Sequence, residues 1–559
     1  MTCKLLCLFL FIAVQVFGVA PSPNVVFIVI DNVDFAYMGK CYGGNGLTPN
    51  MDRMAERGVL FKRAYATTPL CVPSRYTCLT GRYASRSRNV AGGETEDGEG
   101  GWNIEVEKNL PNLPNVMHGA GYATGFVGKF HLEHEKYPRY SGKEASVFSD
   151  EAGAWLKTRQ DWLVGRIQNL KFDYVFNAAD FRSSQFRGID FEGANHNMEA
   201  DVLGALNFIG EHKDKPFFLY MAPRLLHLPI NPNLLLEDYA KMGRVTEGGL
   251  LPEAPQVPMP SRAALHAEAK AAGATTAQQF GMHWLDSGIG AVVNRLEELK
   301  ILDNTLIIVY SDNNQRGKET LYEGGARVPL LMMWPQGIKP GLVCDRIVAN
   351  TDFVPTILDA CGIQPPTDML LDGRSVLPVL KDSSAPWREA LLLENGHTRG
   401  VVSDQWKYVA LRYPPDVQAK IDEVERTGDF PRINQKATTF FLRFKKTLTP
   451  EQWNFARNSW RWHTQGNNYM KSIDDFPFQF DADQLFLISQ SNAPQDTKNV
   501  ASSPENATVL ADMKSKLKQL MEPLQQPFGE FGIPYPAKSP SPEGKPRRKK
   551  RQAPDPRPL

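Results

Sequence analysis

The 559-residue sequence is short of cysteine, of net charge and of long apolar segments. It contains 7 cysteines, and its formal net charge at pH 7 is only +1. A nearly neutral chain has no strong global field to attract a polyanion, so we expect no nucleic-acid partner. Beyond the first 20 residues no run approaches 18 consecutive apolar residues, so we expect no transmembrane segment.

The first 20 residues differ from the rest of the chain. One lysine precedes an apolar run from Leu5 to Phe17, and the small residues Gly18 and Ala20 follow it. This order is typical of a secretory signal peptide, which we expect to span residues 1–18. The sequence therefore predicts a protein of the secretory pathway, either extracellular or in a lysosomal or other lumen.

The cysteines that follow the leader are odd in number. They are Cys41, Cys71, Cys78, Cys344 and Cys361. In an oxidising compartment an odd number leaves at least one cysteine without an intramolecular partner. No Cys-x-x-Cys or His-x-x-x-His pair occurs, so the spacings typical of zinc sites are missing. We expect one cysteine to have a role other than pairing.

Short apolar runs alternate with helical patterns, which is typical of an α/β fold with a large, mostly parallel sheet flanked by helices. The predicted strands are residues 24–30, 122–128, 216–222, 305–310 and 328–334. The predicted helices between them are residues 49–57, 195–209 and 284–299. Thr48 is the expected N-cap of the first helix, because its hydroxyl precedes a proline at the first helical position.

The pattern changes past residue 390. Residues 400–413 alternate in the manner of antiparallel strands, and residues 507–521 have the pattern of a closing helix. The end of the chain is rich in proline and basic residues, a composition typical of disorder. The predicted parts are a signal peptide (1–18), a large α/β domain (22–390), a smaller α+β domain with an antiparallel sheet (391–530) and a disordered tail (533–559).

Polar side chains follow the predicted strands where the strands end. Ligands of open α/β sheets bind outside the carboxyl ends of the strands, so we expect these side chains to converge. Carboxylate and amide oxygens suit Ca²⁺ or Mg²⁺ better than zinc, and lysines and histidines suit an anion. The set predicts a hard-cation site that acts on a tetrahedral oxyanion ester. Its members are Asp31, Asn32, Lys129, His131, His227, Asp312, Asn313 and Lys318.

The stretch CVPSRYTCLTGRY, from Cys71 to Tyr83, resembles the C-x-P-S-R and L-T-G-R signature of the formylglycine-dependent (type I) sulfatases. These enzymes belong to the alkaline-phosphatase-like superfamily. The resemblance covers most of residues 24–380 and extends loosely to about residue 520. Several motifs in the family's order at strand ends are more specific than any one of them. The others are PNVVFIVIDN, GYATGFVGKFHL, KPFFLYMAPRLLHLP, DNTLIIVYSDNN and GKETLYEGGARVPL.

The resemblance implies a sulfuric-ester hydrolase that cleaves an aryl or carbohydrate sulfate to an alcohol and inorganic sulfate. In the family the signature cysteine, here Cys71, is oxidised to Cα-formylglycine, so a formylglycine-generating enzyme is an implied partner. The implied metal is one divalent cation, Ca²⁺ in preference to Mg²⁺, because side chains plus a substrate oxygen suit the larger coordination number. Its implied ligands are Asp31, Asn32, Cys71, Asp312 and Asn313.

The family's catalytic residues carry over by position to Cys71, Arg75, Lys129, His131, His227 and Lys318. Arg75 and Lys129 would brace the formylglycine oxygens. His131 would take the proton when the hydrate collapses. His227 and Lys318 would hold sulfate and assist the leaving oxygen.

The sequence departs from the family at Asn32, where most members have aspartate, and we expect weaker metal binding as a result. Smaller departures are Phe130, Leu226 and Asn314. Two alternative functions remain open: a phosphonate or phosphodiester hydrolase of the same superfamily, and a non-catalytic carbohydrate-binding protein on a sulfatase fold. Asn506, in the sequon Asn-Ala-Thr, is a candidate glycosylation site.

Overall fold

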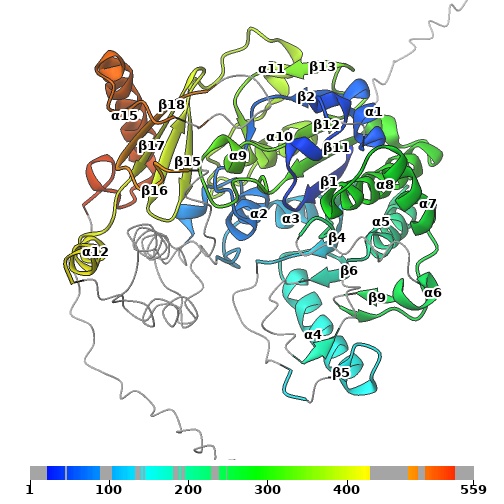
Figure 1. Ribbon diagram of the computed structural model, residues 1–559. Coiled ribbons are helices and arrows are strands. Elements are labelled where there is room, and N and C mark those ends of the chain that lie inside the picture. The colour runs from blue at the N-terminus through cyan, green and yellow to red at the C-terminus, as the bar shows by residue number, and fades with distance from the viewer. Residues whose placement is uncertain are drawn as a thin grey trace, which may run out of the picture. The chain divides into compact units, whose positions relative to one another are not determined.

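The computed structural model describes two compact units (Figure 1). The larger is made mostly of residues up to 395, and the smaller mostly of residues from 396 onward. The predicted signal peptide lies outside the described residues, and so does the predicted tail from residue 535. The described residues are 22–44, 47–87, 104–132, 140–142, 145–179, 188–190, 196–227, 238–246, 248–427, 476–488, 496 and 498–534.

An eight-stranded sheet forms the centre of the larger unit, in the order β13-β2-β12-β11-β1-β8-β4-β6. Strand β12 runs antiparallel to both β11 and β2, whereas the other neighbours run parallel. The prediction of a mostly parallel sheet is therefore confirmed. The strands are β1 (Asn24–Ile30), β2 (Val59–Phe61), β4 (Ala123–Lys129), β6 (Tyr174–Ala179), β8 (Phe217–Ala222), β11 (Thr305–Ser311), β12 (Leu330–Met333) and β13 (Leu342–Cys344).

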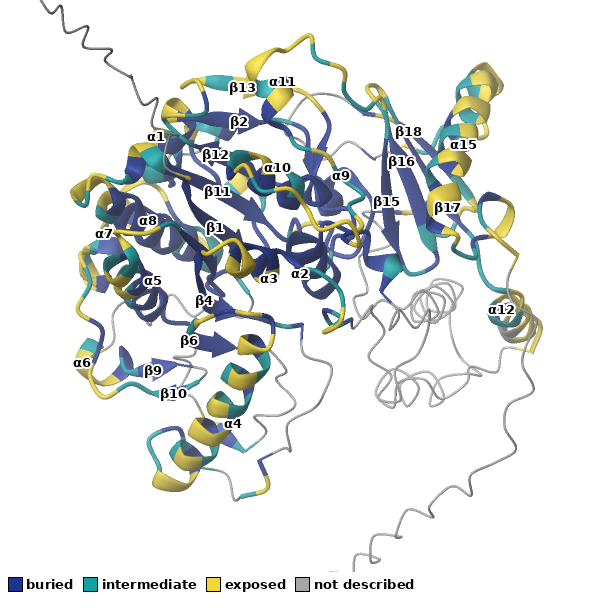
Figure 2. Cartoon of the chain, turned by 180° about the vertical axis from the view of Figure 1, so that it is seen from behind, coloured by how far each residue is buried: buried dark blue, intermediate teal, exposed yellow. Residues whose placement is uncertain are grey.

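The central strands of the sheet are buried on both faces, as their continuous apolar sequences predict. Alternate residues of β1 belong to two different cores: Phe27 packs into one and Ile28 into the other. Figure 2 shows β1 and β11 buried between the helices. Helices α2 (Cys71–Thr80), α3 (Leu113–Gly119) and α10 (Phe353–Ala360) contribute to the core of Phe27, and α5 (Met198–His212) and α8 (Ala277–Glu298) contribute to that of Ile28.

Helix α1 (Pro49–Arg57) has its predicted bounds, and Thr48 is its N-cap residue as predicted, but the predicted capping role of the Thr48 hydroxyl is wrong. The Thr48 hydroxyl accepts a hydrogen bond from the Gly39 amide at 2.6 Å and does not cap the helix. The amides of Asn50 and Met51 instead donate to the carboxylate of Asp286, at 3.0 and 2.9 Å. Asp286 lies on α8, 235 residues from Met51, so the local sequence gives no sign of this contact.

The larger unit also contains helices and strands outside the central sheet. The helices are α4 (Asp150–Gln168), α6 (Tyr239–Met242), α7 (Arg262–Ala271), α9 (Glu323–Ala326) and α11 (Leu377–Lys381). The strands are β3 (Ala64–Tyr65), β5 (Ala145–Ser146), β7 (Ile189–Asp190), β9 (Val245–Thr246), β10 (Gly249–Leu250), β14 (Val348–Ala349) and β15 (Leu391–Asn395).

The smaller unit contains the antiparallel strands predicted around residues 400–413, which are β16 (Thr398–Val402) and β17 (Trp406–Leu411). A third antiparallel strand, β18 (Asp483–Leu487), was not predicted. Helix α15 (Ala507–Met521) has its predicted bounds and buries Leu517. Helix α12 (Pro415–Thr427) also belongs to this unit. In the part of the chain that the structure describes, no helix combines the length and the apolar character needed to cross a membrane.

Candidate active site

The site begins where β1 and β11 end side by side. The two strands pair in parallel with Ile30 opposite Ser311, so Asp31 and Asp312 emerge at the same edge. The Asp312 amide donates to the Ile30 carbonyl at 3.0 Å, and the Asn32 amide donates to the Asp312 carboxylate at 3.3 Å. Both carboxylates are buried, with exposures of 1% and 0%.

Cys71 is the first residue of α2, and its thiol lies among the polar groups of this edge. Its Sγ is 3.3 Å from Nζ of Lys318, 3.6 Å from Nδ2 of Asn313 and 3.7 Å from Oδ1 of Asp31. The N-terminal end of a helix also favours an anion there. A cation, an amide and a carboxylate therefore surround one buried cysteine.

Three cations face the two carboxylates. Arg75, one turn into α2, donates from Nε to Oδ2 of Asp312 at 3.0 Å, and its Nη2 lies 2.8 Å from the same oxygen as an ion pair. Lys129 places Nζ 2.5 Å from Oδ2 of Asp31. Lys318 places Nζ 3.0 Å from Oδ1 of Asn32. The excess of one positive charge suits the binding of an anion.

Burial and neighbouring charges shift the pKa values of these groups. Burial alone would raise the pKa of Asp31. The charges of Lys129, His227 and Arg75 hold that pKa below its usual range. The pKa of Asp312 is raised by burial and by the charge of Asp31. Burial, together with the two carboxylates, also raises the pKa of the Cys71 thiol. An unmodified Cys71 is therefore a poor nucleophile in this position.

The two predicted histidines lie at the same edge. His131 comes two residues after the end of β4, in the left-handed backbone region with φ 54°. His227 comes five residues after the end of β8 and lies close enough to Asp31 to lower the pKa of that carboxyl. The predicted catalytic and metal-binding residues all lie at the carboxyl edge.

Of two further residues, His196 lies at this edge and Asn506 lies outside it. His196 was not predicted; its Nε2 lies 2.9 Å from the backbone oxygen of His227 and so fixes that loop. The sequence signal was only a polar stretch before α5, which does not reveal a partner 31 residues away. Asn506, the glycosylation candidate, lies outside the site, at the start of α15 in the smaller unit.

The residues at this edge fit a hard cation. Oxygen or sulfur atoms of Asp31, Cys71 and Asp312 lie within 4.8 Å of one another. Oδ1 of Asn313 is buried and has no hydrogen-bond partner among the described residues. A buried amide oxygen without a partner is costly unless a ligand satisfies it. The donor set of carboxylate and amide oxygens is the kind that Ca²⁺ and Mg²⁺ prefer.

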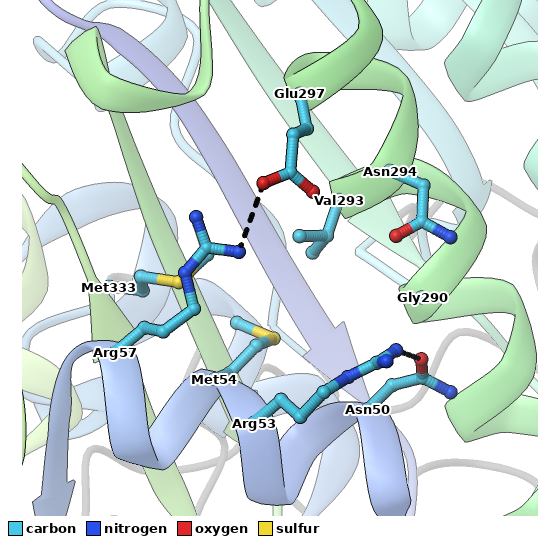
Figure 3. Close-up of a pocket in the computed structure, with 9 residues that line it drawn as sticks. All are labelled: Asn50, Arg53, Met54, Arg57, Gly290, Val293, Asn294, Glu297 and Met333. Carbon is cyan, nitrogen blue, oxygen red and sulfur yellow. Dashed lines mark hydrogen bonds and ion pairs between the residues drawn. The ribbon is translucent and has the colours of Figure 1, made fainter.

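A separate cavity of about 110 Å³ lies between α1 and α8 (Figure 3). Its two arginines already have partners: Arg57 pairs with Glu297 at 3.4 Å, and Arg53 donates to the side chain of Asn50. None of the predicted catalytic or metal-binding residues lines it. The cavity therefore does not compete with the carboxyl edge as the active site.

The family model for sulfatases matches residues 23–363, which include every residue of this edge described above. The chain belongs to the sulfatase family. A second model, of the C-terminal part of N-sulphoglucosamine sulphohydrolase, matches residues 315–424. The chain is a sulfuric ester hydrolase of the alkaline-phosphatase-like superfamily, as its motifs predicted.

Named sulfatases are among its relatives. The chain is 27% identical over 400 residues to N-acetylgalactosamine-6-sulfatase of Sus scrofa, covering 65% of this chain and 67% of the relative. It is 27% identical over 479 residues to N-acetylglucosamine-6-O-sulfatase of Bacteroides thetaiotaomicron, covering 74% and 78%. A solved structure from the glycosaminoglycan-metabolism locus of the same bacterium has a TM-score of 0.56 at 20% identity, covering 90% and 99%. At that identity the structural likeness shows the fold.

Proposed function

We propose that this sulfatase hydrolyses the sulfate ester of a carbohydrate, using the formylglycine form of Cys71. The observation that carries the proposal is the position of Cys71, which is buried within 3.7 Å of Lys318, Asn313 and Asp31. The raised pKa of the thiol argues against direct use of a thiolate. The relatives named after 6-sulfated amino sugars support a carbohydrate substrate.

The hydrated aldehyde supplies one hydroxyl that attacks sulfur and a second whose loss of a proton releases sulfate, as no thiol could. Arg75 and Lys129 hold the two carboxylates in place and put positive charge beside residue 71. His131 accepts the proton of the second hydroxyl. His227 and Lys318 hold the sulfate oxygens and assist departure of the alcohol.

Asp31, Asn32, Asp312 and Asn313 would hold one divalent cation, with Ca²⁺ preferred over Mg²⁺. The side chains that support this assignment are the two buried carboxylates and the unsatisfied Oδ1 of Asn313. When bound, such a cation would polarise a sulfate oxygen and lower the pKa of a nearby hydroxyl. Asn32 is neutral and its Oδ1 already accepts from Lys318, so we assign it the smallest contribution of the four.

We also propose that the chain enters the secretory pathway, that its first 18 residues are removed and that a formylglycine-generating enzyme modifies Cys71 on the way. The leader composition supports the first two steps. The odd number of cysteines after the leader is consistent with the third. We further propose that residues 22–390 form the catalytic domain, residues 391–530 a second domain and Asn506 a glycosylation site.

The test uses the full secreted chain and measures released sulfate. The substrates are N-acetylgalactosamine 6-sulfate, N-acetylglucosamine 6-sulfate, an aryl sulfate and a matched aryl phosphonate. We expect turnover of a sugar sulfate and little turnover of the phosphonate. Preferred hydrolysis of the phosphonate would favour the alternative superfamily activity. Glycan binding without release of sulfate would favour the non-catalytic alternative.

The same preparation tests the modification. Trypsin releases residues Ala64 to Arg75 as one peptide, because no basic residue lies between Arg63 and Arg75. In active protein this peptide should carry an aldehyde, having lost one sulfur and two hydrogens and gained one oxygen. Fully active protein with only unmodified cysteine in this peptide would contradict the proposed mechanism.

A further inference from the structure

One buried amide holds the chain on both sides of Cys71. Asn350, with 0% exposure, begins a short turn after β14. Its Oδ1 accepts from the amide and the hydroxyl of Thr67, at 3.0 and 2.9 Å. Its Nδ2 donates to the carbonyl and the hydroxyl of Ser74, both at 3.3 Å. Thr67 comes four residues before Cys71 and Ser74 three residues after it, so Asn350 closes the turn that presents the thiol.

We name residues 67–74 the Cys71 turn. Its backbone is tied to other parts of the site as well: the Glu319 amide, next to Lys318, donates to the Pro69 carbonyl at 2.9 Å. The Ser74 hydroxyl lies 3.0 Å from the Tyr310 hydroxyl, on the strand that leads to Asp312. Asn350 therefore braces a turn whose neighbours carry the groups that contact Cys71.

We propose that Asn350 is a positioning residue for the nucleophile of this sulfatase. All four of its hydrogen bonds described above go to the Cys71 turn, and four bonds saturate an asparagine side chain. Loss of the side chain frees both ends of the turn, and a misplacement of about 1 Å at a reacting atom can cost about 100-fold in rate. The inference rests on the proposed function and adds to it a residue outside the signature motifs.

The test compares two buried asparagines of the larger unit, Asn350 and Asn24. In Asn350→Ala we expect kcat per mole of aldehyde to fall about 10- to 100-fold. We expect KM to change by less than about threefold, because the proposed sulfate-holding groups His227 and Lys318 lie on other loops. Aldehyde content is measured on the tryptic peptide, so poor modification is not mistaken for poor positioning.

Asn24→Ala is the matched control. Asn24 is also buried, and its amide links Thr305 of β11 and the amide of Phe217 of β8, at 3.4 and 3.3 Å. It lies at the start of β1, at the opposite end of the strand from Asp31. We expect this variant to lose thermal stability but to keep the kcat of the wild-type chain. An equal loss of kcat in both variants would overturn the positioning role.

A second pair of variants covers the case in which Asn350→Ala does not fold. Thr67→Val removes the hydroxyl bond to Asn350 and keeps the amide bond, whereas Thr67→Ser keeps both. We expect kcat to fall about threefold to tenfold in Thr67→Val, the equivalent of one hydrogen bond, and to be restored in Thr67→Ser.

The outcomes separate the two proposals. Wild-type kcat in folded Asn350→Ala, or equal kcat in the two Thr67 variants, overturns the positioning role and leaves the sulfatase function intact. A wild-type chain that carries the aldehyde but releases no sulfate overturns the proposed function, and the positioning role falls with it.

Discussion

Two clusters of buried charge in the larger unit have opposite characters. In one, Glu199 and Arg262 form a closed pair: both carboxylate oxygens accept from the guanidinium, at 3.0 and 2.8 Å. Trp284 donates a further hydrogen bond to this carboxylate at 3.2 Å, and the guanidinium lies 4.7 Å from the Trp284 ring centroid. In the other, around Cys71, two cations contact the two carboxylates and Lys318 contacts the amide oxygen of Asn32. Oδ1 of Asn313 has no hydrogen-bond partner among the described residues.

The difference shows that burial of charge does not by itself mark an active site. The Glu199–Arg262 pair is neutral overall and its polar groups satisfy one another. It therefore has no uncompensated charge with which to bind a ligand. The Cys71 cluster has an excess of positive charge, which can bind an anionic ester. It also has an unsatisfied amide oxygen, which can bind a cation. Perturbed, incompletely paired groups of this kind are typical of functional sites.

Cys71→Ser should abolish the chemistry of the Cys71 cluster with little change in side-chain shape. We expect the protein to be secreted and folded, with a rate of sulfate release at least about 10⁴-fold lower. A serine has one hydroxyl and cannot use a second to expel sulfate. Sulfate release and thermal unfolding, measured on the same preparation, check the prediction. Substantial activity in this variant would contradict it.

Asp312→Ala should remove both a ligand charge and the partner of Arg75. We expect no detectable activity and loss of Ca²⁺ binding in a calorimetric titration. Asn32→Ala is the matched control, and it should weaken Ca²⁺ binding less, because a neutral oxygen contributes less charge. Stoichiometric zinc in the purified wild-type protein would show that the assignment of a hard cation is wrong.

His131→Ala should separate the first turnover from later ones. If His131 accepts the proton that accompanies sulfate release, the first equivalent of alcohol forms at a normal rate and the enzyme then stalls. The steady-state rate should fall about 10²- to 10⁴-fold. Rapid-mixing measurements of alcohol release test this, and equal loss in the first and later turnovers would place His131 in another step.

Glu199→Met should affect stability and spare catalysis, in contrast to the three changes above. It leaves Arg262 buried without its partner, which typically costs about 3–5 kcal/mol of unfolding free energy. The double change Glu199→Met with Arg262→Met should recover much of that loss, because no lone charge remains. Denaturant unfolding and kcat of the folded fraction are the two measurements. A large loss of kcat would mean that the closed pair also serves the site.

The smallest expected effect concerns pH and Asp286, the cap of α1. Burial raises the pKa of Asp286 to about 6, against about 3.9 in an unfolded chain. Between these values the folded state keeps a proton that the unfolded state releases, so the free energy of unfolding falls as pH rises from about 4 to 6. The change is at most about 3 kcal/mol and is complete above pH 6. Asp286→Asn should flatten this part of the stability curve.

The sequence predicted what depends on local pattern. Strand β1 and helices α1 and α15 have the predicted bounds, because continuous apolar residues or helical spacing define them locally. Helix α8 begins at Ala277, seven residues before its predicted start, with Thr276 and Gln279 forming a capping box. The three-residue strands β2 and β13 were missed, because they are too short to show a pattern.

The sequence predicted which residues form the site but not most of the contacts among them. Asp31 and Asp312 each come directly after a strand. This position was enough to predict that they lie together, because adjacent parallel strands end at one edge. The contacts of Asn350 with Thr67, or of His196 with the His227 backbone, join loops far apart in the chain. Only the packing of the helices and turns determines such contacts, so a single sequence does not contain their signal.

The cysteines have a practical consequence. Cys41, Cys71, Cys78, Cys344 and Cys361 are all unpaired in the structure, and four of them are buried. The described part of the molecule therefore needs no oxidant to reach its fold. Production in a reducing cytosol that lacks the formylglycine-generating enzyme should give a soluble protein with an intact thiol at residue 71. Such material would be a zero-activity reference with the wild-type sequence. Because Cys71 is buried in the folded protein, we expect the modifying enzyme to restore activity only when it acts on the unfolded chain before refolding.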